Sequence, residues 1–189
     1  CICCTVRGEL IRILSGLMKR ADRLDAIIVE TTGLADPAPV AQTFFVDQDV
    51  ADRTKLDAIV TVADAVHLST QLTDHHEAEE QIAFADVVLL NKIDLVEESG
   101  LNIVKDRIKK INPFAKIINT KKCGVPLNEI LDLDAFSLKR VLDIETTNEN
   151  IHDILHNLFY DILNIEFNLW PWVRNMCKYG DFFLFLDIN

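Results

Sequence analysis

Apolar residues along the first 145 positions follow two patterns that alternate. Recurrence every three or four positions predicts helices at residues 6–20, 75–84, 101–111 and 126–131. Short continuous runs rich in β-branched residues predict buried strands at residues 24–29, 58–62, 87–90 and 115–119. Strands that alternate with helices indicate an α/β fold, in which a parallel sheet carries helices on both faces.

The pattern changes after residue 145. Both tryptophans and both tyrosines lie beyond it, and we expect a helix at 150–163 and a strand at 182–186. The sequence therefore predicts two regions, an α/β domain at 1–145 and a short α+β tail of uncertain origin at 146–189. The segment Trp170-Pro171-Trp172 fits either a partner-binding surface or the core of a small subdomain.

The predicted strand at 87–90 ends in Asn91-Lys92-Ile93-Asp94. The Asp94 carboxylate can accept from the two N–H groups on the Watson–Crick edge of guanine. Asn91 can bond the opposite edge of the ring, and the stem of Lys92 can cover its plane. Adenine lacks this donor pair, so the motif favours GTP over ATP. The alternative is an ordinary turn, because these residue types are common after strands.

Glu30-Thr31-Thr32-Gly33 follows the first predicted strand. Glu30 can reach Mg²⁺ through water or orient a hydrolytic water, and Gly33 can bring its N–H close to a γ-phosphate. An ordinary turn is again the alternative, and the guanine motif downstream favours the catalytic interpretation.

Ligands of parallel sheets bind at the carboxyl ends of the strands. Glu30, Asn91 and Thr120 all lie at such ends, so we expect the chemistry to converge there. Thr120 begins the loop that we expect to touch the guanine carbonyl oxygen. Asp64 ends the second strand and suits either a helix cap or a ligand contact.

Cys1-Ile2-Cys3-Cys4 places three thiols within four residues. Thiolates suit Zn²⁺ or Cu⁺, although buried free cysteines would also pack well. Candidates for a further ligand are Glu30, His67, His75 and His76. The His75-His76 pair, which precedes several glutamates, fits either a second metal site or the solvated face of a helix.

The net charge of −11 argues against nonspecific binding to nucleic acid or to an anionic membrane. No apolar run is long enough to cross a bilayer, and the first residues show no signal-peptide pattern. The dense cysteine cluster suits metal binding in a reducing compartment better than a disulfide framework. We expect a cytoplasmic protein.

With these motifs in hand, residues 1–145 resemble the CobW-like GTPases, a metallochaperone family of the P-loop class. The matching segments lie at 1–10, 30–37, 62–66, 89–95 and 135–138. The resemblance implies a P-loop NTPase-like fold that uses GTP, Mg²⁺ and a transition metal, commonly zinc. It also implies delivery of that metal to a client metalloprotein or to a corrinoid-pathway protein, with a homodimer left open.

The resemblance also implies residue roles. Glu30 and Gly33 would form the switch, and the metal ligands and base contacts would be Cys1, Cys3, Cys4, Asn91, Lys92 and Asp94.

Two features depart from the family pattern. The G-x-x-x-x-G-K-[ST] loop is absent from these residues, and its place would lie upstream of Cys1. We therefore expect a GTPase domain truncated at its N-terminus, with little activity on its own. Residues 164–181 instead resemble the portal protein of T-even-type phages. A chimera with a structural tail and an adaptor that binds metal without GTPase activity are the alternatives.

Overall fold

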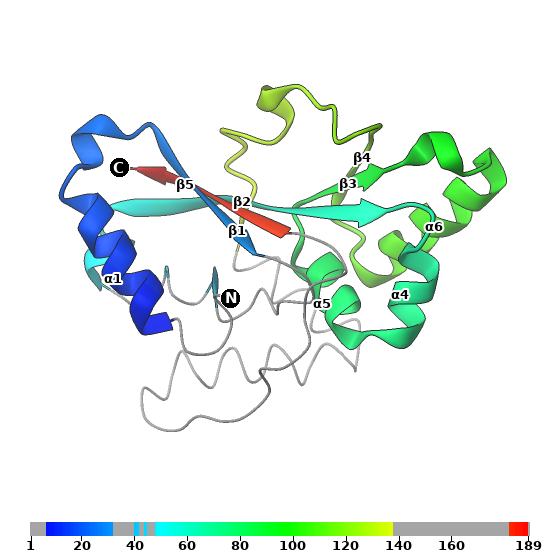
Figure 1. Ribbon diagram of the computed structural model, residues 1–189, viewed down its shortest axis with the longest axis horizontal. Helices are drawn as coiled ribbons and strands as arrows, with labels where there is room; N and C mark the ends of the chain where they lie inside the picture. Colours follow the sequence, from blue (N-terminus) through cyan, green and yellow to red (C-terminus); the bar gives the residue numbers. More distant parts are fainter. Residues whose placement is uncertain (1–6, 32–39, 42–43, 45–47, 138–181, 189) are drawn as a thin grey trace.

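A computed structural model describes residues 7–31, 40, 41, 44, 48–137 and 182–188 (Figure 1). The helices are α1 (Arg7–Met18), α3 (Gln48–Ala51), α4 (Leu68–Asp74), α5 (His76–Phe84) and α6 (Glu98–Ile111). The strands are β1 (Ala26–Thr31), β2 (Thr54–Asp64), β3 (Val87–Asn91), β4 (Lys116–Asn119) and β5 (Phe182–Ile188). Short 3₁₀ turns occupy Ala21–Arg23, Ile93–Leu95 and Leu127–Glu129.

The sheet has five strands in the order β1-β5-β2-β3-β4. The β2–β3 and β3–β4 pairs are parallel, as predicted. β5 runs antiparallel to both β1 and β2, so the sheet is mixed and not wholly parallel. Figure 1 shows this strand crossing between β1 and β2. The sequence predicts β5 as a strand but carries no signal for its partners, which lie far away along the chain.

One face of the sheet packs against helices. Ile27, Val29 and Ile59 join buried residues of α1, α3 and α5 in one cluster. Val88 and Leu90 join buried residues of α4, α5 and α6 in a second cluster. The α/β class predicted from the sequence is therefore confirmed.

The opposite face is covered differently. Ala58, Val60, Val87 and Leu89 pack against apolar residues of the segment 125–135. Within the part of the chain that the structure describes, this segment contributes only a 3₁₀ turn and no α-helix. Its apolar residues are interrupted by Pro126 and alternate with aspartates near its end, a pattern that does not form a continuous helical stripe.

A buried aspartate at a strand irregularity holds this segment in place. Asp57 lies where the β2–β5 register shifts between Leu56 and Ala58. Its side-chain Oδ1 accepts from the N–H of Asp134 at 2.5 Å, and its carbonyl accepts from the N–H groups of Ala135 and Phe136 at 2.9 Å. Such irregularities re-aim a strand locally, and here the aspartate connects the sheet to the segment 125–135.

Some predicted boundaries differ from the structure. β2 begins at Thr54 and not at 58, because Thr54–Leu56 pair with β5. The segment 126–131 forms a single 3₁₀ turn, and α4 is an additional helix with one buried residue, Leu68. The predicted helix at 150–163 and the portal-like stretch at 164–181 lie outside the described residues. No helix among the residues described is long and apolar enough to cross a membrane.

Asn112, which is 1% exposed, connects the two helices next to β3. Its Nδ2 lies 2.8–3.0 Å from the carbonyl oxygens of Ile82, Ala83 and Ala85 at the end of α5. Its Oδ1 accepts from the N–H groups of Phe114 and Ala115. One side chain therefore bonds backbone groups that precede β3 and backbone groups that precede β4, and this positions both strands.

We expect Asn112→Ala to lower the free energy of unfolding by roughly 2 to 4 kcal/mol, because several buried backbone groups lose their partner. Urea denaturation of the full-length protein measures this change. The matched control is Asn102→Ala on the exposed surface of α6, with an expected change within about 0.5 kcal/mol. Equal changes for both variants would contradict the role of Asn112.

Candidate functional site

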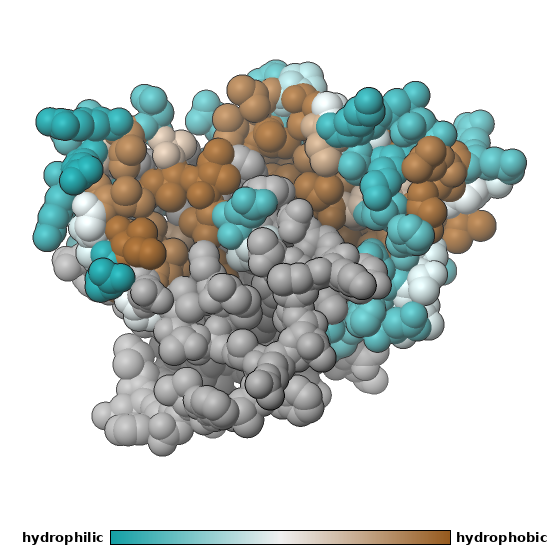
Figure 2. All heavy atoms as spheres, in the orientation of Figure 1, coloured by the Kyte–Doolittle hydropathy of each residue, from teal (hydrophilic) through white to brown (hydrophobic). Residues whose placement is uncertain are grey.

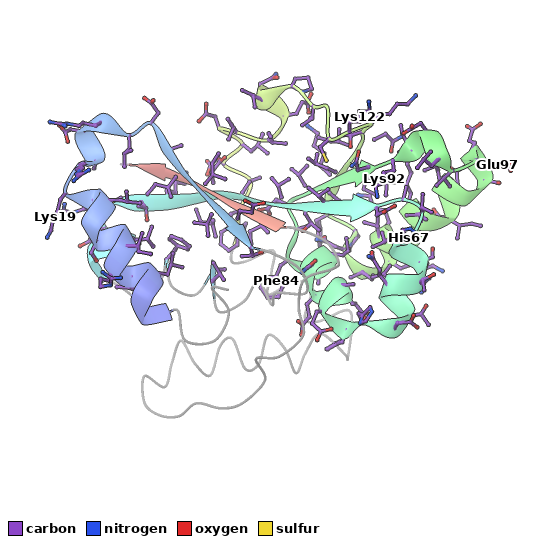
Figure 3. The ribbon with its side chains drawn as sticks, viewed as in Figure 1. Lys19, His67, Phe84, Lys92, Glu97 and Lys122 are labelled. Atoms are coloured by element: carbon purple, nitrogen blue, oxygen red, sulfur yellow. The ribbon has the colours of Figure 1, made fainter. Side chains whose placement is uncertain are left out.

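Three parallel strands end together at one edge of the sheet. The register pairs Asp64 with Asn91, and Leu90 with Asn119. The Ala65 N–H donates to the Asn91 carbonyl at 2.9 Å, and the Thr120 N–H donates to the Leu90 carbonyl at 2.8 Å. These bonds continue the pairing past the strand ends and hold the first loop residues in place. Figure 3 shows His67, Lys92 and Lys122 at this end and Lys19 at the other.

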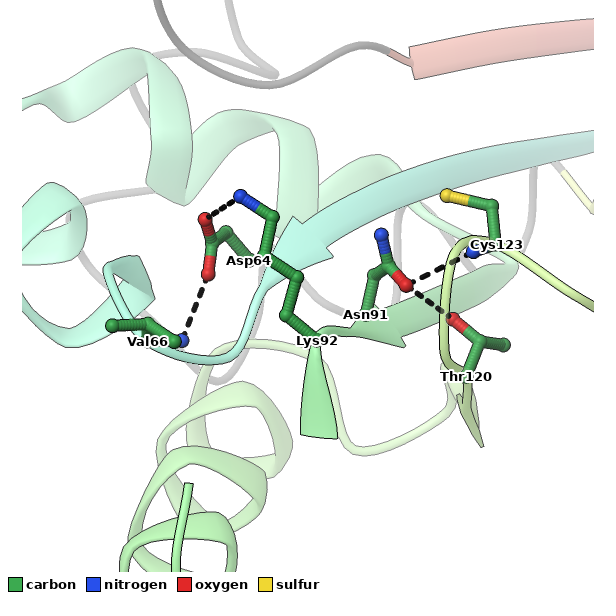
Figure 4. Close-up of polar contacts among 6 residues, drawn as sticks. All are labelled: Asp64, Val66, Asn91, Lys92, Thr120 and Cys123. Atoms are coloured by element: carbon green, nitrogen blue, oxygen red, sulfur yellow. Dashed lines mark hydrogen bonds and ion pairs between the residues drawn. The ribbon is translucent and has the colours of Figure 1, made fainter. Parts of the chain in front are cut away.

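Asn91 is held in one orientation by two donors. Its Oδ1 accepts from the Thr120 hydroxyl at 3.2 Å and from the Cys123 N–H at 3.0 Å (Figure 4). Its Nδ2 has no hydrogen-bond partner among the described residues. The amide therefore offers two N–H donors to a ligand acceptor, and the orientation that offers them is fixed from the β4 side.

Asp94 offers the complementary chemistry. It lies in the 3₁₀ turn Ile93–Leu95, directly after the strand that carries Asn91. Its side chain is exposed and has no hydrogen-bond or ion-pair partner within the described part of the chain. A free carboxylate beside an oriented amide can accept two N–H groups of one ligand edge.

Lys92 adopts a left-handed backbone conformation, with φ of 62°. Its Nζ lies 2.8 Å from Oδ2 of Asp64, and the Val66 N–H donates to Oδ1 of Asp64 at 2.9 Å (Figure 4). Asp64 therefore does not cap α4, which begins after His67 without any side-chain cap. It connects the ends of β2 and β3.

The pair shifts both pKa values. Partial burial alone would raise the pKa of Asp64, but the Lys92 and Val66 hydrogen bonds and the charges of Lys92 and His67 outweigh it, so this pKa is lowered from 3.8. The hydrogen bond from Lys92 to Asp64, together with the carboxylate charge, raises the pKa of Lys92 from 10.5. Both groups are thus charged at neutral pH.

The loop after β4 has an unusual backbone. Lys122 and Cys123 have φ of 50° and 53°, and the Gly124 N–H donates to the Lys121 carbonyl at 3.0 Å. Thr120 is only 2% exposed. We expected Thr120 to begin a loop that touches the base. In the structure the Thr120 hydroxyl donates to the Asn91 amide oxygen, so its side chain orients that amide.

Glu30 lies apart from this group. It is exposed near the end of β1, and β5 and β2 separate it from β3. The register places Glu30 beside Phe183, which lies opposite Val60 of β2, well short of the strand end at Asp64. The structure therefore brings Asn91, Lys92 and Thr120 together but does not bring Glu30 to them, because β5 and β2 lie between β1 and β3.

The predicted metal ligands Cys1, Cys3 and Cys4, together with Gly33, lie outside the described residues. No cluster of three or more metal-binding side chains occurs among the residues that are described. His76 is exposed on α5 and lies 3.9 Å from Glu79 and 3.6 Å from Glu80, whose side chains are partly covered.

Sequence reasoning missed Cys123. Its role comes from a backbone N–H in a left-handed conformation, which no side-chain pattern indicates. The sequence predicted Asp64 only as a helix cap or a ligand contact. Its ion pair with Lys92 follows from the register of β2 and β3, which sets Asp64 opposite Asn91. Figure 2 shows hydrophilic side chains around one hydrophobic group over the region of α4 and α6 beside this edge.

The family model described as CobW/HypB/UreG, nucleotide-binding domain, matches residues 1–119. The chain belongs to this family. It is 40% identical to the zinc-regulated GTPase metalloprotein activator 1 of Schizosaccharomyces pombe, over 81% of this chain and 38% of that protein. It is 30% identical to the zinc chaperone YjiA of Escherichia coli, over 82% of this chain and 48% of that protein.

A solved structure shares the fold of this family member. The Zn(II)-bound triple mutant of the YjiA GTPase matches with a TM-score of 0.61 and 22% identity. The match covers 95% of this chain and 71% of that one. The chain spans less than half the length of the curated relatives described above.

We expect Lys92→Met to raise the pKa of Asp64, because it removes the ammonium and leaves the burial that disfavours the carboxylate. Carboxyl-detected NMR of the Asp64 side chain over a pH titration measures this. Because the folded pKa of Asp64 is lowered, the pair stabilises the native state above pH 3.8, and this contribution disappears as the pH falls through the lowered pKa. On the alkaline side it disappears as the pH rises through the raised pKa of Lys92. An unchanged Asp64 titration in Lys92→Met would contradict the pair.

Proposed function

We propose that the chain is the base-recognising part of a metallochaperone that binds and hydrolyses GTP and delivers a transition metal. The observation that carries this proposal is the pair formed by an oriented amide donor at Asn91 and a free carboxylate at Asp94 on one strand end. These two groups match the two edges of guanine. Family membership supports the same assignment.

Base selection follows from hydrogen-bond polarity. The Asp94 carboxylate accepts from the N1–H and the 2-amino group of guanine, and the Asn91 amide donates to N7 on the opposite edge. Adenine has an acceptor at N1 and no 2-amino group, so it would leave the carboxylate facing a lone pair. The exposed stem of Lys92 covers the ring. In the loop after β4 the N–H groups of Cys123 and Gly124 already bond to Asn91 and Lys121, so the N–H groups of Lys121 and Lys122 are the ones that would bind the guanine carbonyl oxygen.

In this proposal, the residues for GTP hydrolysis lie at the end of β1. Glu30, with Gly33 after it, would orient the attacking water and contact Mg²⁺ through water. The exposed carboxylate of Glu30 is a hard oxygen donor that suits this ion. Mg²⁺, when bound, would neutralise charge on the phosphates. β5 and β2 lie between β1 and β3, so in this proposal the base lies at β3 and the phosphates extend toward β1.

Metal is the cargo in this proposal. Cys1, Cys3 and Cys4 would bind zinc or a similar ion as thiolates, and Glu30 is a candidate to couple this site to nucleotide turnover. The names of the relatives, a zinc-regulated GTPase activator and a zinc chaperone, support zinc and a client metalloprotein. We place the protein in the cytoplasm, with neither nucleic acid nor membrane as a partner.

Asp94→Asn should reverse base preference. The asparagine amide offers a donor to the 2-carbonyl of xanthine and no longer accepts both guanine donors, so GTP affinity should fall roughly a hundredfold while XTP affinity rises. Displacement of a fluorescent GDP analogue from the full-length protein measures both.

The matched control for this exchange is Asp106→Asn on the exposed surface of α6, which should bind GTP as the unmodified protein does. GTP affinity that stays unchanged in Asp94→Asn would exclude Asp94 from base recognition.

The metal site has its own test. Replacing Cys1, Cys3 and Cys4 with serine in the full-length protein should abolish tight zinc binding and any effect of zinc on GTP hydrolysis, because serine is a poor zinc ligand. Cys177→Ser, which removes a thiol outside the motif, is the matched control. Zinc-dependent hydrolysis that survives the triple substitution would separate the motif from metal delivery.

A further inference from the structure

The Lys92 side chain is half exposed, yet its end is tethered. The exposed fraction of the side chain is 50%, and its ammonium lies 2.8 Å from the Asp64 carboxylate. A free lysine stem samples many rotamers, and ordering it costs binding free energy. Here an anchor on the neighbouring strand restrains it before any ligand arrives.

Asp64 is itself firmly placed. Its side chain is 19% exposed, and the parallel pairing of β2 with β3 sets its backbone opposite Asn91. The Val66 N–H holds the carboxylate oxygen that does not contact Lys92. The anchor is therefore a group fixed by strand pairing and by a local turn, and it does not depend on Lys92 for its own position.

We propose that Asp64 is a positioning residue of the guanine site, which anchors the Lys92 ammonium so that the lysine stem lies ready to cover the purine ring. This inference rests on the proposed function, because it assumes that a purine binds beside Asn91 and Asp94. Asp64 does not touch the base. It acts through Lys92, and it sets affinity without setting the choice between guanine and adenine.

The substitution that tests this is Asp64→Asn. Its side-chain oxygen can still accept from the Val66 N–H, so the local turn is retained while the ion pair is lost. Lys92→Met removes the ammonium from the other side and keeps an unbranched stem. If the anchor is the shared cause, each single variant and the double variant lose the same amount of affinity.

The experiment is a double-mutant cycle on the full-length protein, with the affinity for a fluorescent GDP analogue as the readout. We expect each single variant to bind roughly threefold to fivefold more weakly, and the double variant to bind no more weakly than either single one. Higher ionic strength should weaken binding more in the unmodified protein than in Asp64→Asn, because only the former has a charge pair to screen. The ratio of GDP to ADP affinity should stay the same in all variants.

Two results would overturn the inference: unchanged affinity in Asp64→Asn, or losses that add in the double variant. Thermal unfolding without nucleotide separates an effect on the site from an effect on the fold, and Asp64→Glu, which keeps the charge, should recover part of the affinity if the fold is intact. The outcome of the base-exchange test at Asp94 does not depend on the outcome of this one. A reversed preference there with no effect at Asp64 would overturn only the present inference.

Discussion

The parallel pairing of β2 with β3 is the constraint on which the candidate site depends. It sets Asp64 opposite Asn91, and one residue further it brings the Lys92 ammonium to the Asp64 carboxylate. The β3–β4 pairing does the same for Thr120, whose hydroxyl orients the Asn91 amide. The register of the three strands therefore brings these side chains together, and a slip by one residue would separate them.

In the proposed function, the sheet keeps the residues for the base apart from the residue for the phosphates. Asn91 and Asp94 lie after β3, whereas Glu30 lies on β1 beyond two intervening strands. A nucleotide has an aromatic end and a charged end, and such a separation allows each end its own residues. Buried hydrogen bonds from Asn112 to the end of α5 hold the helical layer against β3, which supports the edge that carries the candidate site.

The sequence predicts local elements well, because they depend on periodicity and on adjacent residues. The strand predicted at 87–90 is confirmed and extends to Asn91, and the helix predicted at 101–111 is confirmed with an earlier start at Glu98. The position of β5 was not predictable, since its partners lie far along the chain and its own residues set no direction. The roles of Asp64 and Cys123 likewise depend on register and on backbone conformation, which side-chain patterns do not show.

The central claim is that guanine binds between Asn91 and Asp94 at the end of β3. A crystal structure of the full-length protein with GDP tests it most directly. The account predicts that N1 and the 2-amino group of guanine lie within hydrogen-bond distance of the Asp94 carboxylate, and N7 within that distance of Nδ2 of Asn91. A base bound elsewhere, or a base whose Watson–Crick edge faces solvent, would contradict it.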